Sequence, residues 1–461
     1  MAAVGEPAEL NHARDALALN LELSHAAGER PGVSSAQLRR VRAWRALRLC
    51  AALAIPFVAG AAASLALSRV ALAPGARLAP PRADDHVPRA LTKLAFGSCA
   101  RAELPQPFWR PIVDSRPDVF VFAGDIVYGD CLHTAEGQSC APLDEAWAKL
   151  GAHADFRLAR EAALPIVGML DDHDSGQNDC GAQNPFRSYA KRAFLDFFAV
   201  PESDVWRTRP GLYRSRLYDG RAPDGARRVT QLLLLDVRSF REPEWRAARA
   251  PAPGHERYEE ETGVRALGAS ILGDEQWAWL DGQLRTPADL RVVVSTIQVL
   301  PLSHGWERWG LFPHELARLV GALRAAGGGA VLLSGDRHLG ALYKYTPDAP
   351  QRPPAQYPNS TAAPERSVPA ARARALFELT SSSLTHAFGC TTERPCAAEE
   401  GPMLGGRPLV HENNWGELAV DWRARTLTLA LRRASNATAA DGRRLGDTLL
   451  QHVANFDELG M

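Results

Sequence analysis

From Leu91 onward the sequence predicts an α/β domain. Short apolar runs alternate there with longer amphipathic segments, a pattern typical of strands and helices combined in one domain. Four of the apolar runs end directly in a cluster of carboxylate or histidine side chains. Because ligands of open α/β sheets bind at the carboxyl ends of strands, the clusters are expected to converge at one edge and form a single site.

The expected elements follow from these runs in chain order. Strands are expected at Leu94–Phe96, Val119–Ala123, Ile166–Leu170, Gln231–Leu235, Val292–Ile297 and Val331–Leu333. Helices are expected at Asp144–Ala163, Phe186–Phe198, Asp274–Leu284 and Pro313–Ala326. The Pro- and Arg-rich stretch 347–374 predicts a surface excursion. A last pair of strands is expected at Trp415–Val420 and Thr426–Leu431.

An uncharged stretch precedes the domain. Residues 49–68 contain no charged side chain, and a run of about twenty such residues has the length of a transmembrane helix. Five arginines stand between residues 39 and 48, whereas only three stand between residues 69 and 82. Because positive charge stays on the cytoplasmic side, residues 1–48 are expected in the cytoplasm. Residues 69–90 then form a linker, and the catalytic domain lies on the lumenal or extracellular side.

A cleaved export signal is the alternative to this anchor. The tripeptide Ala71-Leu72-Ala73 has the small-x-small form of a cleavage site, and cleavage there would yield a secreted protein. Pro74 directly after it disfavours the cut, and the segment before the apolar run is long for a signal. The anchor is therefore the favoured interpretation.

The composition excludes some classes of partner. Lys and Arg together number 53, and so do Asp and Glu, so no bulk charge directs the chain to nucleic acid. Seven cysteines are too few for a disulfide scaffold in 461 residues. Cys131 and Cys140 bracket one short polar segment, and Cys390 and Cys396 bracket another. Each pair is either a local disulfide or two unpaired thiols.

The polar clusters at the strand ends carry the chemistry. They are Asp125-Ile126-Val127-Tyr128-Gly129-Asp130, Asp171-Asp172-His173-Asp174, Asp236-Val237-Arg238 and Asp336-Arg337-His338. Neighbouring carboxylates raise one another's pKa and resist ionisation, which bound cations would relieve. Asp, His and Tyr ligands with few thiolates suit Fe, Zn, Mn or Ca. With two or more such ions, a bridging water becomes a hydroxide near neutral pH and can attack phosphorus.

Together with Phe96-Gly97-Ser98-Cys99 and Ser334-Gly335-Asp336-Arg337-His338, these clusters resemble the successive motifs of one family. It is the alkaline phosphatase D (PhoD-like) metallophosphatases of the calcineurin-like metallophosphoesterase superfamily. The resemblance implies an αββα sandwich for a domain at residues 91–435, which leaves residues 436–461 as a C-terminal tail. It also implies a metal-dependent phosphoric ester hydrolase.

The resemblance implies metal ligands position by position. Asp125 matches the aspartate that bridges two metals, and Tyr128 matches the tyrosine that binds ferric ion in purple-acid-phosphatase-like members. Asp172 stands where the superfamily usually has a metal-binding asparagine. Asp336 and His338 occupy the two ligand positions of the last motif.

Further positions are implied to handle the substrate. His173 stands where the superfamily has the histidine that protonates the leaving group, and Asp174 is expected to hold its ring. Arg238, at a strand end, is expected either to hold a phosphate oxygen or to pair with Asp236 or Asp174.

Two positions depart from the superfamily pattern. Its opening Asp-x-His is absent, and Gly97-Ser98-Cys99 in its place makes Cys99 either a thiolate ligand or a small buried apolar residue. The histidine expected after the strand Val292–Ile297 is also absent. Gln298 is the nearest match and His304 lies further on, so either is a candidate for the missing ligand.

The leading hypothesis is hydrolysis of a phosphomonoester or phosphodiester by a metal-bound hydroxide, with His173 as general acid. The sequence does not distinguish a monoester, a diester and a lipid headgroup as the substrate. The alternative is a membrane-tethered binding or scaffold protein on the same fold, inactive because the histidine is missing. Retention of His173 and of the carboxylate clusters favours the enzyme. The sequence indicates no oligomeric state.

Overall fold

The computed structural model describes residues 84–134, 137–246, 258–259, 269–302, 304, 306–346, 374–388, 409–437 and 442–461. The expected cytoplasmic segment, the anchor at 49–68, most of the excursion at 347–374 and the pair Cys390 and Cys396 lie outside the described residues. Among the residues described, no helix combines the length and the apolar character needed to cross a bilayer.

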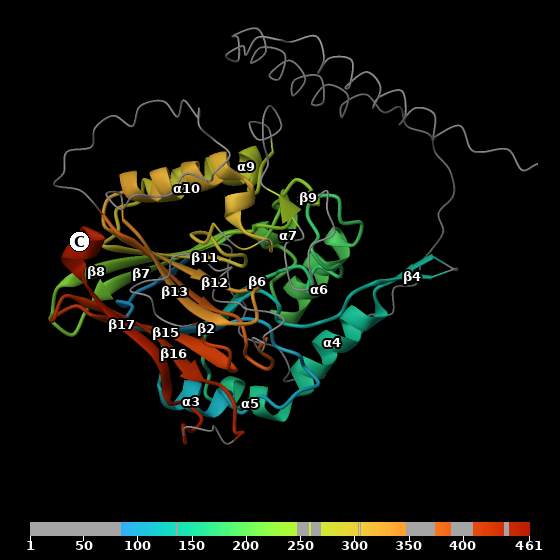
Figure 1. Cartoon of the computed structure of the whole chain (residues 1–461), viewed down its shortest axis with the longest axis horizontal. Coiled ribbons are helices and arrows are strands. Elements are labelled where there is room, and N and C mark those ends of the chain that lie inside the picture. Colours follow the sequence, from blue (N-terminus) through green and yellow to red (C-terminus); the bar gives the residue numbers. More distant parts are fainter. Residues whose placement is uncertain are drawn as a thin grey trace, which may run out of the picture. The chain divides into compact units, whose positions relative to one another are not determined.

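Two β-sheets lie face to face between layers of helices (Figure 1). The first sheet has the order β1 (Asp84–Val87), β7 (Arg214–Arg221), β8 (Arg227–Leu234), β11 (Leu290–Ser295), β12 (Gly329–Ser334), β14 (Leu376–Ser381) and β13 (Gly340–Tyr345). The second has the order β17 (Thr448–Asn455), β16 (Thr426–Arg433), β15 (Asn414–Asp421), β2 (Lys93–Gly97), β3 (Val119–Ala123) and β6 (Ile166–Met169). Strands β8, β11, β12 and β14 run parallel, as do β2, β3 and β6.

The first sheet is buried on both faces, which explains its nearly continuous apolar strands. Along β8 and its end, Leu232 and Leu234 pack in the core between the sheets, whereas Leu233 and Leu235 pack in a separate core under the helices. Alternate residues of a strand point to opposite faces, so one unbroken apolar run supplies both cores. The helices over this outer face are α9 (Gly273–Leu284) and α10 (Pro313–Ala325).

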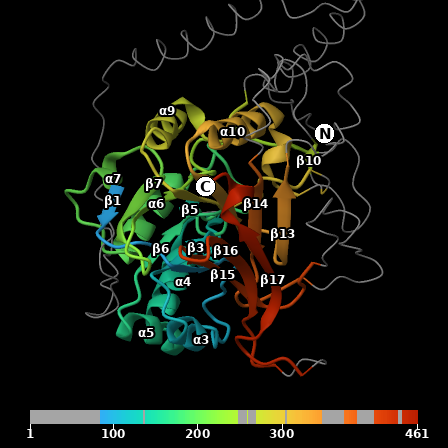
Figure 2. The same cartoon turned by 90° about the vertical axis from the view of Figure 1, so that its left-hand side faces the viewer.

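Other helices cover the outer face of the second sheet, on the opposite side of the molecule from α9 and α10 (Figure 2). They include α3 (Trp109–Asp114), α4 (Ala141–Ala152) and α5 (Ala154–Glu161). Trp109 of α3 lies 4.8 Å from the Phe120 ring of β3 and 5.2 Å from the Phe156 ring of α5, measured between ring centroids. This aromatic contact holds α3 and α5 on the sheet.

The remaining elements are short or connect the layers. They are α6 (Arg187–Phe197), α7 (Val205–Thr208), η1 (Trp309–Leu311), α12 (Phe456–Leu459) and the two-stranded pairs β4 (Leu132–Thr134) with β5 (Gly137–Ser139) and β9 (Trp245–Arg246) with β10 (Tyr258–Glu259). The mixed α/β fold predicted from the sequence is confirmed. Each expected strand coincides with a strand of the structure to within a few residues at its ends.

Three expectations about element bounds are wrong. The single helix expected at Asp144–Ala163 is two helices, because His153 is extended and its Nδ1 accepts a hydrogen bond from the Asp155 N–H at the start of α5. The end of the expected linker forms β1, which pairs with β7. The expected tail forms β17 and α12, with β17 paired to β16. As an edge strand with few buried side chains, β17 has only a weak apolar pattern.

Candidate metal centre

The polar clusters converge at the carboxyl ends of strands from both sheets. Cys99 follows β2, Asp125 follows β3 and Asp172 follows β6, all in the second sheet, whereas Asp336 and His338 follow β12 of the first. The expected single site is therefore formed where the two sheets meet. We call these residues, with Tyr128 and His173, the strand-end centre.

Four residues of this centre have a backbone conformation that is uncommon outside glycine. The φ angles are 59° at Cys99, 47° at Asp125, 71° at Asp336 and 53° at His338. Left-handed backbone at such residues costs free energy and persists only where the surrounding structure imposes it, as it often does at functional sites. The strain therefore coincides with four of the expected metal ligands.

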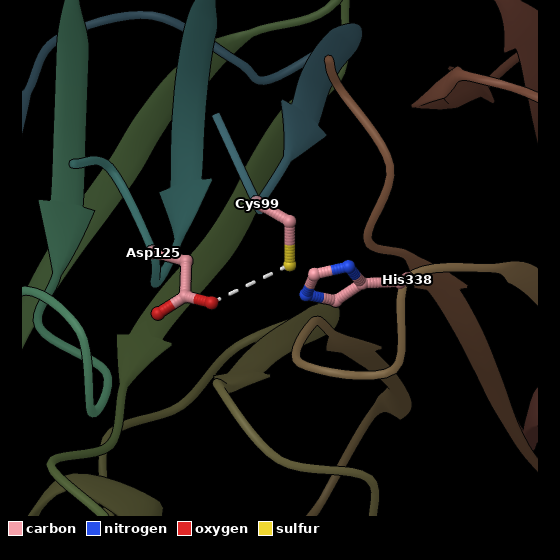
Figure 3. Close-up of side chains that lie close together, drawn as sticks. All are labelled: Cys99, Asp125 and His338. Carbon is pink, nitrogen blue, oxygen red and sulfur yellow. Dashed lines mark hydrogen bonds between the residues drawn. The ribbon is translucent and has the colours of Figure 1, made fainter. Parts of the chain in front are cut away.

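Cys99, Asp125 and His338 form the first possible ligand set. Their ligand atoms all lie within 4.8 Å of one another, and Figure 3 shows the three side chains pointing toward a common point. The Cys99 thiol lies 3.6 Å from Asp125 Oδ2. The Tyr128 hydroxyl donates to the same Oδ2 at 3.0 Å and lies 3.1 Å from His338 Nε2. One sulfur, one nitrogen and two oxygens thus surround one position.

The electrostatics of this set fit a bound cation. Burial, reinforced by the Asp125 charge, raises the pKa of Cys99 and of Tyr128, and burial with the Asp172 charge raises the pKa of Asp125 itself. Burial also lowers the pKa of His338 to about 3, which leaves a neutral imidazole, the form that binds metals. Within the described part of the chain, Asp125 Oδ1 and His338 Nδ1 have no hydrogen-bond partner. A metal ion would stabilise the ionised thiol, carboxyl and phenol together.

Asp172 links this set to further carboxylates. It belongs to three other groups of close potential ligands: Asp125 with His173, Asp171 with Asp336, and Asp179 with Glu307. Burial opposes its ionisation, but the Arg238 and His173 charges and N–H donors of His173 and Asp179 keep the pKa of Asp172 below its ordinary value. Burial raises the pKa of Asp336. The residues present therefore fit more than one ion, and Asp125 and Asp172 each belong to more than one of the possible ligand groups.

His173 contacts a different carboxylate from the one expected. Its Nδ1 lies 3.0 Å from Asp130 Oδ2 and 3.1 Å from Asp130 Oδ1. Burial opposes protonation, but the hydrogen bond to Asp130 and the charges of Asp125 and Asp172 raise the pKa of His173 to about 10. The expectation that Asp174 holds the ring is wrong. Asp174 instead accepts the backbone N–H groups of Val127 at 2.8 Å and Asp171 at 3.0 Å, and so joins the loops after β3 and β6.

Arg238 is buried and ion-paired. Its guanidinium donates to Asp171 and, at 2.7 Å, to Glu307, and only 4% of its side chain is exposed. The guanidinium pairs with neither Asp236 nor Asp174, the two partners considered from the sequence, although the Arg238 backbone N–H donates to Asp236 Oδ1 at 3.1 Å. Asp236 receives the backbone N–H groups of Leu212 and Ser239. Arg238 is therefore a counter-ion within the carboxylate cluster, and its Nη2 lies 3.7 Å from Asp336 Oδ1.

The two candidates for the missing histidine make hydrogen bonds to residues outside the strand-end centre. The Gln298 amide donates to Thr380 Oγ1 at 2.9 Å and to the Tyr343 hydroxyl at 3.2 Å. His304 accepts the Trp306 N–H at 3.2 Å, and none of the four ligand groups among the described residues includes it.

Two acidic residues near the centre were not singled out from the sequence. Asp130 ends the first motif, five residues after Asp125. Its place in that motif is the sequence feature that could have marked it as a residue of the site. Glu307 lies in the loop before η1 and binds both Arg238 and Arg241. No local pattern distinguishes Glu307 from a solvent-exposed glutamate, yet it is buried.

A disulfide lies beside Asp130. Cys131 and Cys140 are bonded, which decides between the two alternatives for this pair. The bond closes the base of the β4–β5 hairpin. The Cys131 N–H donates to the Gly176 carbonyl at 2.8 Å, and a Cβ on Gly176 would lie 2.6 Å from the Cys131 sulfur. The disulfide therefore packs directly on the loop that carries His173.

Comparisons with known proteins agree with this geometry. Residues 94–394 match the family model described as PhoD-like phosphatase. The solved structure described as "Structure of PhoD" superimposes with a TM-score of 0.58 at 16% identity, over 82% of this chain and 72% of that chain. A weaker likeness, with a TM-score of 0.43, 9% identity and coverage of 80% and 89%, is to "GAP50 the anchor in the inner membrane complex of Plasmodium". No curated protein matches the sequence.

The family model spans well over half of the chain and includes every residue of the strand-end centre. The likeness to PhoD independently shows a shared fold. The protein is thus a phosphoric ester hydrolase, and the chain belongs to the PhoD-like phosphatase family.

Proposed function

We propose that the protein is a membrane-anchored phosphatase or phosphodiesterase of the calcineurin-like superfamily, in which a metal-activated hydroxide attacks phosphorus and His173 protonates the leaving group. The observation that carries the proposal is the convergence of Cys99, Asp125 and His338 beside the Asp172 and His173 pair. Thiolate, carboxylate, imidazole and phenol ligands together suit Fe, Zn or Mn, and the neighbouring all-carboxylate set also suits Ca.

The proposed ligands divide into two groups. Cys99, Tyr128 and His338 would hold one ion, Asp172 and Asp336 would hold another, and Asp125, which belongs to two of the ligand groups, would contribute to the site. Ions bound there would activate a water as nucleophile and neutralise the phosphoryl oxygens. Arg238 supports this arrangement, because it offsets the charge of Asp171 and Glu307 and keeps Asp336 within 3.7 Å. Four of these ligands, Cys99, Asp125, Asp336 and His338, have left-handed backbone.

His173 is proposed as the proton donor because of its surroundings. Its Nδ1 is committed to Asp130, which leaves Nε2 for the departing oxygen. The carboxylates around the ring favour the imidazolium, the form that a general acid requires. Its side chain is 19% exposed, so substrate can reach it.

The proposed location is supported by the sequence and by one disulfide. The arginines before residues 49–68 favour a cytoplasmic N-terminus and a domain on the other side of the membrane. The disulfide between Cys131 and Cys140 supports that side, because such bonds persist in oxidising compartments.

The test uses the full-length protein purified in detergent. Metal analysis should find bound ions, and the protein should hydrolyse p-nitrophenyl phosphate or its bis ester. Chelation should abolish turnover, and added metal should restore it. The variant Asp125→Asn should lose both metal and activity, because Asp125 belongs to two ligand groups. Bound metal without turnover of any ester would instead support the inactive scaffold.

A further inference from the structure

The two arginines that the motifs place near the strand-end centre are buried, and the partly exposed His173 is already assigned to the leaving group. Arg238 is enclosed by Asp171 and Glu307, and Arg337 is buried with its guanidinium 5.2 Å from the centre of the Trp306 ring. A phosphoester brings at least one full negative charge to the centre. Bound metal ions would offset part of this charge, and an exposed cation beside them would offset more of it.

Arg101 is an exposed cation beside the centre. It is two residues beyond Cys99, and its backbone is fixed because the Arg101 N–H donates to Thr385 Oγ1 at 2.9 Å. The preceding Ala100 N–H donates to the Asp125 carbonyl at 2.9 Å. The chain that carries Arg101 is thus tied directly to two segments of the centre.

The Arg101 side chain extends over a ring of the centre. Its guanidinium carbon lies 4.9 Å from the centroid of the Tyr128 ring, within the range of a cation–π contact. The hydroxyl of that ring contacts Asp125 and His338. The guanidinium is therefore held next to the first ligand set, while 46% of the side chain remains exposed.

The present counter-ion of Arg101 is a weak competitor for a phosphate. Glu103 Oε1 lies 3.6 Å from Arg101 Nη1, and 48% of the Glu103 side chain is exposed. Exposed pairs at such distances contribute little to stability. A guanidinium, by contrast, presents parallel N–H donors that match two oxygens of a phosphate. Substrate can thus replace Glu103 at small cost.

We propose that Arg101 binds the non-bridging oxygens of the substrate phosphoryl group and directs the site toward phosphomonoesters. The proposal rests on the proposed phosphoester hydrolysis. A phosphomonoester carries roughly −1.5 to −2 charge at neutral pH, whereas a diester carries a single charge because its second acidic oxygen is esterified. An additional cation beside the first ligand set therefore favours the monoester.

The test compares two esters with the same leaving group, p-nitrophenyl phosphate and bis(p-nitrophenyl) phosphate. Arg101→Ala should lower kcat/KM for the monoester by roughly 10- to 100-fold, the effect of losing a hydrogen bond between charged groups, and for the diester by less than about threefold. Arg101→Lys should lose less for the monoester, because it keeps the charge without the planar fork. The binding of inorganic phosphate, measured by calorimetry, should weaken by a factor similar to the monoester effect.

Arg110→Ala is the matched control, since Arg110 is an exposed arginine on α3. It should leave both esters unaffected. Metal content and thermal unfolding should be the same in all variants. Equal loss on both esters, loss of metal, or unchanged phosphate binding in Arg101→Ala would overturn the proposal while an active wild type upholds the hydrolase. A wild type that turns over neither ester would overturn the proposed function and this inference with it.

Discussion

His173 Nδ1 contacts Asp130 Oδ2, so Asp130 is the carboxylate expected to orient the ring for proton donation. We expect Asp130→Asn to lower the rate on alkyl phosphates by about 10- to 100-fold, the usual effect of removing a partner that orients an active-site histidine. Asp174→Asn should leave substrate preference unchanged but reduce the free energy of unfolding by about 1–3 kcal/mol, because Asp174 receives two buried N–H groups. Kinetics and denaturant unfolding of both variants check this. A change of preference in Asp174→Asn alone would reverse the assignment.

His173→Ala tests the proton donor itself. General acid catalysis contributes roughly 10²–10⁴-fold when the leaving group needs a proton. The variant should therefore slow the hydrolysis of alkyl phosphates by about that factor. Hydrolysis of p-nitrophenyl phosphate should fall much less, because p-nitrophenolate departs unprotonated. Metal content should stay near the wild-type value. Equal losses on the two substrates, or lost metal, would make His173 a ligand or a structural residue.

Tyr128 is placed to bind an ion through its phenolate, since its hydroxyl contacts Asp125 and His338. A phenolate bound to ferric iron absorbs visible light, so the iron-loaded protein should be coloured. Tyr128→Phe should bleach that band while the protein stays folded. Visible spectra with metal analysis provide the measurement. An active, iron-containing wild type whose spectrum is the same as that of Tyr128→Phe would refute the role.

The β4–β5 hairpin depends on the disulfide at its base. The bond joins residues 9 apart in sequence, and closing a loop of that size stabilises a protein by about 2–3 kcal/mol in the chain-entropy model. The double variant Cys131→Ser with Cys140→Ser should lose about that much in denaturant unfolding. Reduced wild-type protein serves as the comparison and should lose the same amount. Unfolding curves that coincide for oxidised, reduced and variant protein would contradict this.

The close approach of the loops after β3 and β6 depends on Gly124. Its φ is 89°, and a Cβ there would lie 2.5 Å from the Asp171 Cβ. Only glycine allows this contact without displacement of the neighbouring loop. The distance between Asp125 and Asp172 therefore depends on the contact between the loops after β3 and β6 as well as on the pairing of the two strands.

The orientation of the whole chain in a membrane is the remaining prediction. Residues 1–48 are proposed to face the cytoplasm because arginines precede the uncharged stretch 49–68. Protease added to intact membrane vesicles of cytoplasmic-side-in orientation should spare an N-terminal tag and remove a C-terminal one. Detergent should expose both tags. Loss of the N-terminal tag alone from intact vesicles would reverse the proposed topology.

Much of the fold was predictable because its information is local. Strands such as β3 and β12 are buried along their whole length, so their apolar runs stand out in the sequence. β17 and β1 were missed because they lie at sheet edges, where fewer side chains are buried. The break at His153 was not anticipated because it depends on one extended residue and its cap, which leave the apolar pattern of the two helices uninterrupted.

The sequence by itself determined which residues are candidate metal ligands. Each candidate lies in a motif that directly follows a strand, and both the strand and the spacing within the motif can be read from one segment of the chain. The tertiary structure alone decided that Asp130 rather than Asp174 contacts His173, that Glu307 and Asp171 enclose Arg238, and that Arg101 covers Tyr128. These pairings join loops from different strands. Such contacts depend on how the two sheets meet and on the backbone turns at their ends, which no single segment encodes.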